Sequence, residues 1–310
     1  MDRAMRIIRE VRKALIGKDD IIQKVLMGIL SRGHILLEDI PGVGKTTLAT
    51  AFSKAIRLEY KRIQFTPDVM PTDITGFTMY EKDTGKLRFV PGAILTNLLL
   101  ADEINRANSR TQAALLEAME EEQVTVDGTT YPIPKPFLVI ATQNPIGAQG
   151  TQLLPDSQLD RFMLRLSIGY PSEADEIEIM RQQQKTDARP AVQPVSDARE
   201  ILSMQTDVEN IYISEPIFDY VVRLVNATRQ HPLIAQGGSP RASLALMRLS
   251  QASAFLQGRD YVIPQDVAEI LYDAVGHRLI LSQKAKLEGV SAKDALSQVY
   301  RGVEIPGTGQ

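Results

Sequence analysis

The fold is decided by the stretch Ile35-Leu36-Leu37-Glu38-Asp39-Ile40-Pro41-Gly42-Val43-Gly44-Lys45-Thr46-Thr47. An apolar run ends there in a loop with two glycines, and a helical pattern follows. In such a loop the backbone N–H groups surround an oxyanion, the lysine reaches the outer phosphates and the next hydroxyl ligates Mg²⁺. The helix that begins near Lys45 directs its positive end at the same phosphates. The stretch therefore predicts a phosphate site, although the G-x-x-x-x-G-K-[ST] pattern requires a glycine where this chain has Asp39.

Two adjacent carboxylates close a second buried strand, because the apolar run 98–101 ends in Asp102 and Glu103. In P-loop NTPases the acidic residue at the end of such a strand holds Mg²⁺. Successive side chains on a strand diverge, so we expect Asp102 on the metal side and Glu103 as the general base for the attacking water. The simpler alternatives are two solvated acids at a strand end and an ordinary strand-to-helix turn at the glycine loop.

The composition is that of a folded protein of two domains, with 310 residues, 44% of them apolar and 24% charged. A net charge of −3 gives no overall basic field, which argues against a dedicated nucleic-acid binder. The chain has no cysteine, which excludes disulfides and thiolate–metal sites. Its longest apolar runs are too short to span a bilayer, and residues 1–18 lack the apolar segment of a secretion signal. We therefore expect a cytoplasmic protein without a membrane span.

Helical and strand patterns alternate in the first half of the chain. A helix over 19–32, a strand over 34–38, a helix over 45–56 and a strand over 60–65 predict a β-α-β unit, and hence a parallel sheet with helices on both faces. Further strands are expected at 137–141 and 163–168. Two hairpins are expected within 77–90 and 124–131, the second around the turn signal Asp127-Gly128.

From residue 197 onward the pattern is helical throughout. The sequence therefore predicts an α/β core over 1–185, a linker over 186–196 that contains Pro190 and Pro194, and a helical domain over 197–302. The tail over 303–310 is expected to be disordered.

Two further polar residues lie near strand ends and have more than one interpretation. Asn144 follows a buried strand, where its amide could position water or sense the γ-phosphate, or could simply begin a turn before Pro145. Arg161 is either an ion-pair partner of Asp156 or Asp160 or a cation for another subunit's nucleotide, and its spacing favours the ion pair.

Helix starts are marked by hydroxyl residues. Ser109-Arg110-Thr111-Gln112 has the pattern of a capping box that begins a helix running to about Glu121. Ser239-Pro240 begins another helix, whose first turn contains Arg241. The helix dipole disfavours a cation there, so Arg241 either has a function or is one of the many exposed arginines that tolerate such a position.

Other chemistries lack support in the sequence. The histidines at positions 34, 231 and 277 have no metal-ligand spacing, and neither an H-E-x-x-H nor a G-x-S-x-G motif is present. No Asn-Lys-x-Asp signature of guanine binding follows the carboxylate pair, which favours adenine.

The phosphate-loop residues 37–46 are followed in order by the stretches 65–68, 73–76, 99–107, 111–121, 125–128, 141–145, 159–162 and 239–242. In these stretches, across essentially the whole chain, the sequence resembles the MoxR AAA+ ATPases. The resemblance implies an α/β fold with a P-loop AAA+ core followed by a C-terminal all-α lid domain. It also implies that the hairpins are the helix-2 and presensor-1 inserts, and that Asp39 with Pro41 is a usual variant of the phosphate loop.

The resemblance implies a role for each matching residue. The nucleotide would be bound by the loop Pro41, Gly42, Val43, Gly44, Lys45, Thr46 and Thr47, with Ile16 and Gly17 packing on the adenine. Thr46 and Asp102 would hold Mg²⁺, and Glu103 would be the catalytic base. Asn144 would be sensor 1, Arg161 the arginine finger and Arg241 sensor 2, and both arginines would serve a neighbouring subunit's nucleotide.

The function implied by the resemblance is Mg²⁺-dependent ATP hydrolysis in a ring, with six subunits expected. Hydrolysis would drive chaperone-like remodelling of client proteins, or their maturation by metal or cofactor insertion, together with proteins that carry von Willebrand A domains. A nucleic-acid motor and a nucleotide-gated scaffold that does not hydrolyse ATP are the alternatives.

Overall fold

A five-stranded parallel sheet lies at the centre of the first part of the chain, in a computed structural model that describes residues 2–144, 154–185 and 191–307. The strand order across the sheet is β2 (Tyr60–Gln64), β5 (Leu98–Asp102), β8 (Leu138–Gln143), β1 (Ile35–Glu38) and β9 (Leu164–Leu166). All neighbouring strands in it are parallel, as the β-α-β pattern predicts. Every strand end that carries a candidate residue therefore points to the same edge of the sheet.

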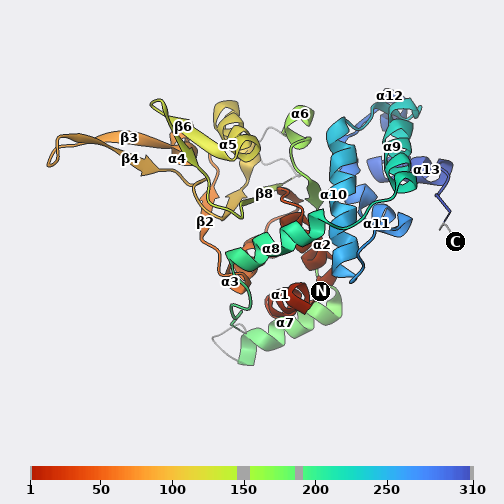
Figure 1. Cartoon of the computed structure of the whole chain (residues 1–310), viewed down its shortest axis with the longest axis horizontal. Helices are drawn as coiled ribbons and strands as arrows, with labels where there is room; N and C mark the ends of the chain where they lie inside the picture. Colours follow the sequence, from red (N-terminus) through yellow and green to blue (C-terminus); the bar gives the residue numbers. More distant parts are fainter. Residues whose placement is uncertain (1, 145–153, 186–190, 308–310) are drawn as a thin grey trace.

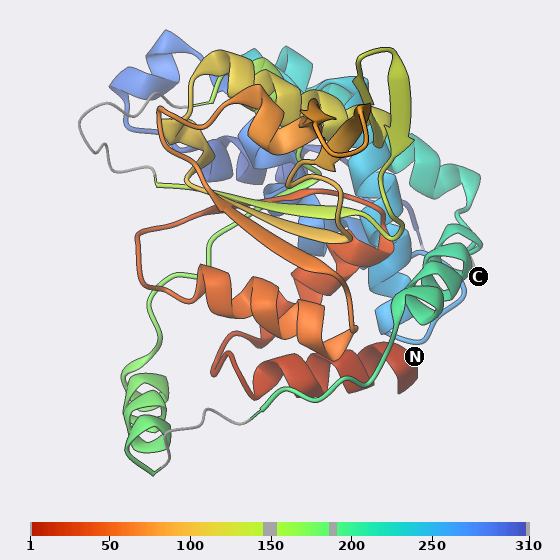
Figure 2. The same ribbon diagram turned by 90° about the vertical axis from the view of Figure 1, so that its left-hand side faces the viewer.

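Alternate residues of the three central strands, β5, β8 and β1, enter two different cores, and helices cover both faces of the sheet (Figure 2). Leu37 and Leu100 face α1 (Asp2–Arg12), α2 (Asp19–Leu30) and α3 (Lys45–Ala55), whereas Leu36 and Leu99 face α5 (Ser109–Glu121). Buried parallel strands of this kind read as continuous apolar runs, which is why the sequence pattern located them.

Two antiparallel hairpins project from one end of the molecule (Figure 1). The first joins β3 (Gly76–Glu81) to β4 (Lys86–Pro91) and follows the short helix α4 (Pro71–Thr75); the second joins β6 (Gln123–Val126) to β7 (Thr129–Pro132). Asp127 and Gly128 both have positive φ, 47° and 78°, as a two-residue hairpin turn requires. The rings of Phe89 and Tyr131 stack with their centroids 3.8 Å apart, so the two hairpins contact each other.

Helices dominate the rest of the chain. After α6 (Asp156–Leu159) and α7 (Glu173–Lys185) come α8 (Ala198–Glu209), α9 (Glu215–Gln230), α10 (Pro240–Leu256), α11 (Pro264–Val275), α12 (Gln283–Leu287) and α13 (Ala292–Gly302). One addition to the expected helices is a small antiparallel sheet of β10 (Ile234–Gln236) and β11 (Ile280–Leu281). Within the described ranges, no helix combines the length and apolarity needed to cross a membrane. The expected tail is irregular over 303–307, and its last three residues lie outside the described part.

The helical part packs directly on the α/β part. Residues of α2, α8, α10 and α11 belong to one continuous apolar cluster with one face of the sheet. The buried Gln205 side chain donates a 2.8 Å hydrogen bond to the Ile29 carbonyl, and Lys24 forms an ion pair with Asp273 at 2.8 Å. The two parts are therefore joined by a common core.

The expected helix from Ser109 to about Glu121 is confirmed, but the capping box expected at Ser109 is wrong. The N-cap of α5 is Asn108, whose side chain accepts a hydrogen bond from the Thr111 N–H at 3.0 Å, so Ser109 is already the first helical residue. Asparagine is as good an N-cap as serine, and sequence spacing does not separate the two. The start of α10 is as predicted, because Ser239 Oγ accepts from the Arg241 N–H at 3.1 Å.

Candidate nucleotide site and arginine cavity

The glycine loop connects β1 to α3 at the edge of the sheet where the strands end. Gly42 and Gly44 have φ values of 88° and 102°, a conformation that side chains disfavour. Among the described residues, no atom lies within 4 Å of a Cβ built on Gly42, and Pro41 and Gly42 are exposed. Within the described residues no side chain caps the start of α3 at Gly44, and the positive end of a helix favours a bound anion there.

Asp39 has a structural task that explains its place in the loop. Its carboxylate accepts hydrogen bonds from the Ile168 N–H at 2.5 Å, the Ser167 hydroxyl at 3.0 Å and the Gly169 N–H at 3.2 Å. The side chain is buried. It ties the start of the glycine loop to the chain that leaves β9, a connection that glycine could not make.

Lys45 lies among the acidic residues of the site. Its ammonium donates to the carbonyl oxygens of Asp39 and Ile40, at 2.7 and 3.2 Å. Burial lowers the pKa of Lys45 below its ordinary value, and the negative charges of Asp39, Asp102 and Glu103 act against that shift. The structure thus brings the lysine and both carboxylates into one electrostatic environment.

Asp102 is fixed at the end of β5 through both of its oxygens. Oδ1 accepts from the Thr142 hydroxyl at 2.6 Å, and Oδ2 pairs with the guanidinium of Arg62 at 2.7 Å. Sequence reasoning missed Arg62 and Thr142. The available signal was weak: a polar residue in the middle of β2 and another near the end of β8, which become neighbours of Asp102 only once the strand order is known.

Glu103 leaves the strand in a left-handed conformation with φ of 56°. Its carboxylate accepts from the Gln64 amide at 3.0 Å and pairs with Arg106 at 2.8 Å. The partners of the two acids are joined, because the Arg62 guanidinium that pairs with Asp102 also donates to the Gln64 side chain at 3.1 Å. Gln64 is a further residue that sequence reasoning missed.

Asn144 directly follows β8, the strand that lies between β1 with its glycine loop and β5 with its carboxylates. Its side chain is half-buried. The strand order thus places Asn144 between the two halves of the candidate site. The alternative interpretation, a turn that Asn144 begins before Pro145, depends on residues outside the described part of the chain.

A cleft of about 180 Å³ adjoins the glycine loop, lined by Lys13, Ala14, Leu15, Ile16, Lys18, Gly42, Val43, Gly44, Thr47, Pro171, Ile179 and Gln182. Ile16 and Val43 give it apolar walls suited to a flat base. Gly17 does not line the cleft; its φ is 69°, and a Cβ there would collide with Asp175. Of the two residues expected at the adenine, the structure brings Ile16 to the loop and gives Gly17 a role in the turn.

The site offers oxygen ligands of the kind that Mg²⁺ prefers. They are the Thr46 hydroxyl in the first turn of α3 and the Asp102 carboxylate, and Mg²⁺ beside a nucleotide completes its shell with waters and phosphate oxygens. Across the described ranges, no group of three or more His, Asp or Glu side chains forms a metal site. A cation held by few protein ligands and by the substrate fits this arrangement.

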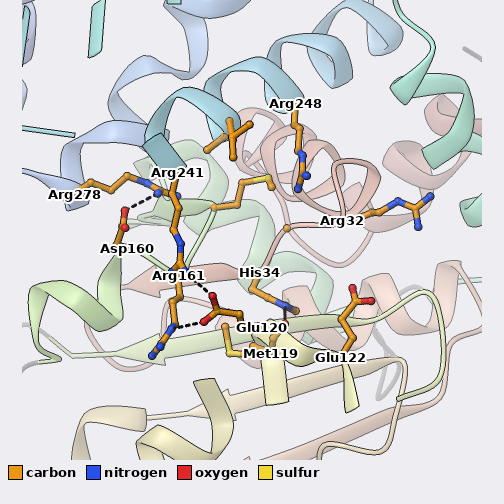
Figure 3. Close-up of a pocket in the computed structure, with 14 residues that line it drawn as sticks. Arg32, His34, Met119, Glu120, Glu122, Asp160, Arg161, Arg241, Arg248 and Arg278 are labelled. Carbon is orange, nitrogen blue, oxygen red and sulfur yellow. Dashed lines mark hydrogen bonds and ion pairs between the residues drawn. The ribbon is translucent and has the colours of Figure 1, made fainter. Parts of the chain in front are cut away.

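Arg161 and Arg241 meet in a different cavity, of about 270 Å³ (Figure 3). Both side chains converge on Glu120, near the end of α5: Arg161 Nε lies 3.0 Å from Oε2, and Arg241 pairs with Oε1. The local ion pair with Asp156 or Asp160 that spacing favoured for Arg161 is wrong, because Arg161 pairs with Glu120 instead, and Asp160 pairs with Arg278 at 2.7 Å. This cavity and the cleft at the glycine loop share no lining residue among those described.

Comparison with known proteins defines the class. Residues 34–164 match the ATPase family associated with various cellular activities (AAA), and residues 226–299 match the AAA lid domain. The fold and the site are accordingly those of a nucleotide-binding AAA ATPase with a C-terminal lid.

Relatives and a solved structure narrow the family. The chain is 44% identical to the protein YeaC of Bacillus subtilis, over 96% of this chain and 93% of that protein. It is 40% identical to Chaperone MoxR1 of Mycobacterium tuberculosis, over 97% of this chain and 82% of that protein. A crystal structure from Cytophaga hutchinsonii, 38% identical, superposes with a TM-score of 0.93 over 99% of this chain and 96% of its own. The chain belongs to the MoxR family of AAA+ ATPases.

Proposed function

We propose that the chain hydrolyses ATP at a site shared by two copies. One copy contributes the loop 41–47 and the residues Asp102, Glu103 and Asn144; the neighbouring copy contributes Arg161 and Arg241. The observation that carries this proposal is the separation of the two cavities: the paired arginines line a cavity of their own, and the cleft at the glycine loop lacks both of them.

Phosphoryl transfer places negative charge on the phosphate oxygens, and the proposed residues bind or neutralise that charge or activate the attacking water. Lys45 and the N–H groups at the start of α3 bind the phosphates, and Glu103 holds the attacking water and takes its proton. Mg²⁺ bound to Thr46 and Asp102 would neutralise negative charge on the phosphate oxygens. Asn144 orients the water or senses the γ-phosphate. Arginines supplied by a neighbour are typically worth roughly 10³ to 10⁵ in rate.

Binding of Mg²⁺ to Asp102 would compete with an ion pair within the chain. Arg62 occupies Oδ2 of Asp102, and that arginine side chain is half exposed. The Asp102 carboxylate is only 11% exposed, so a divalent cation that displaces Arg62 must supply the positive charge in its place. The Thr142 hydroxyl keeps the other oxygen of Asp102 oriented meanwhile.

The biological output that we propose is chaperone-like remodelling of client proteins by a hexameric ring in the cytoplasm, where ATP is produced. The relative named Chaperone MoxR1 and the resemblance to the MoxR family support it. The same resemblance supports partners with von Willebrand A domains and a role in client maturation by metal or cofactor insertion. The hairpins β3–β4 and β6–β7 are the elements that we propose to contact clients, because they project from one end and expose Tyr80 and Leu87.

Two experiments test the shared site. Glu103→Gln should keep ATP binding and abolish turnover, and unchanged hydrolysis would remove Glu103 from its role. Mixing Arg161→Ala subunits with Lys45→Ala subunits should recover part of the activity, because a mixed interface is intact where the Arg161→Ala subunit supplies the loop and the Lys45→Ala subunit supplies the arginine. Complete absence of recovery in rings shown to be mixed would contradict the shared site.

A further inference from the structure

Glu120 connects three elements that are distant in the sequence. It lies in the last turn of α5, Arg161 follows α6, and Arg241 lies in the first turn of α10. Each carboxylate oxygen takes one guanidinium, Oε2 that of Arg161 at 3.0 Å and Oε1 that of Arg241 (Figure 3). These are the two arginines that we propose to act on a neighbour's nucleotide.

The cavity around Glu120 is rich in positive charge. Five arginines line it, against three acidic residues: Arg32, Arg161, Arg241, Arg248 and Arg278 against Glu120, Glu122 and Asp160. Arg278 is paired with Asp160, and Arg32 with Glu209 outside the cavity. Glu122 pairs with Lys135 at 2.5 Å. In the described part of the chain, Glu120 is thus the carboxylate that holds Arg161 and Arg241 near each other despite their repulsion.

We propose that Glu120 is a positioning residue that takes the place of a phosphoryl group in the separate subunit. A carboxylate and a phosphate both offer paired oxygens to guanidinium groups, so the two ion pairs with Glu120 orient the arginines side by side. When two copies meet, the neighbour's γ-phosphate replaces Glu120 as their common anion. This inference rests on the proposed function, in which both arginines act across the interface.

Replacing Glu120 by a phosphate requires the two ion pairs of Glu120 to be broken. Glu120 is 41% exposed and the arginines 33% and 44%, and such ion pairs are weak in solvent, so a phosphate can displace them. Removing the charge of Glu120 should therefore tighten assembly that depends on a bound nucleotide. If two weak pairs no longer have to be broken, half-assembly should need a roughly three- to ten-fold lower protein concentration.

The test is sedimentation velocity with Mg²⁺ and a non-hydrolysable ATP analogue, on wild type, Glu120→Gln and Glu122→Gln. Glu122→Gln makes the same charge change two residues away without touching either arginine, and should assemble like wild type. Glu120→Gln should assemble at the lower concentration with the analogue and should not change without nucleotide. Glu120→Asp keeps the charge but is one methylene shorter, so it should hold one arginine and fall between the two.

Three outcomes would overturn the inference, and a fourth tests the proposed function on which it rests. Assembly of Glu120→Gln at an unchanged or higher concentration, or an equal gain without nucleotide, would overturn it. The double variant Glu120→Gln with Arg161→Ala should keep only part of the gain, because one of the two arginines that Glu120→Gln releases is then absent. A full gain in the double variant would also overturn it. If Arg161→Ala and Arg241→Ala alone assemble like wild type with the analogue, the shared site fails instead, which is a separate result.

Discussion

Replacing Asp39 by asparagine is expected to lower the free energy of unfolding by about 2–3 kcal/mol, because the amide cannot accept all the hydrogen bonds of the carboxylate. Oδ2 accepts from the Ile168 N–H, and Oδ1 accepts from the Ser167 hydroxyl and the Gly169 N–H. If the amide oxygen faces Ile168, the serine hydroxyl can turn to accept from the NH₂ group, but the Gly169 N–H loses its acceptor. The opposite orientation sets the NH₂ group against the Ile168 N–H, at the position of the shortest bond, and is worse.

The measurement is urea unfolding followed by circular dichroism, with the slope of unfolding free energy against urea expected to stay unchanged. Asp127→Asn is the matched control. It makes the same substitution at a hairpin turn with φ of 47°, where asparagine is favoured, and should stay within about 0.5 kcal/mol of wild type.

Nucleotide affinity should fall with the stability of Asp39→Asn, because the Asp39 carbonyl also anchors the Lys45 ammonium. A variant as stable as the control would refute the assignment of Asp39 as the tie between the glycine loop and β9. A variant that is less stable but binds ATP like wild type would show that the Asp39 hydrogen bonds contribute to folding and not to nucleotide binding.

The remaining predictions concern pH, the hairpins and the glycine loop. Burial lowers the pKa of His34 to about 4 and that of His277 to about 3, so both side chains stay neutral in the folded protein. In the unfolded chain both become protonated as the pH falls below the ordinary histidine pKa of 6.5. The free energy of unfolding should thus fall by roughly 3 kcal/mol from pH 7.5 to 5.5 through these two residues, as urea titrations at both pH values would show; no loss would contradict their burial. Phe89→Ala and Tyr131→Ala should show a coupling of about 0.5–1.5 kcal/mol in a double-mutant cycle, and additivity would mean that the stack does not join the hairpins. Gly44→Ala, with φ of 102°, should cost about 1–3 kcal/mol and weaken ATP binding measured by calorimetry, whereas an unchanged affinity would show that the loop tolerates a side chain.

The sequence was sufficient wherever the signal is local. Buried parallel strands appear as apolar runs, the glycine loop and the turn at Asp127 require positive φ, and Ser239 caps its helix. The parallel sheet with helices on both faces followed from the alternation of these elements. The same local reasoning placed Asp102 and Glu103 at a strand end.

Contacts between distant residues could not be read in this way. Spacing suggested a nearby carboxylate for Arg161, but its partner Glu120 lies 41 residues earlier and meets it only because α5 ends beside α6 and α10. Arg62 and Thr142 each lie 40 residues from Asp102 and reach it only in the observed strand order. Side-chain pairing of this kind depends on tertiary packing, which residue spacing does not encode.

The apolar cluster that the α/β and helical parts bury together limits how the chain can be recombined. A fragment that ended at residue 196 would uncover the face of α2 that packs on α8 and α10. A contiguous apolar face that is exposed to solvent favours aggregation. A chimera that took its helical part from a relative would therefore also need the matching face of α2 from the same donor.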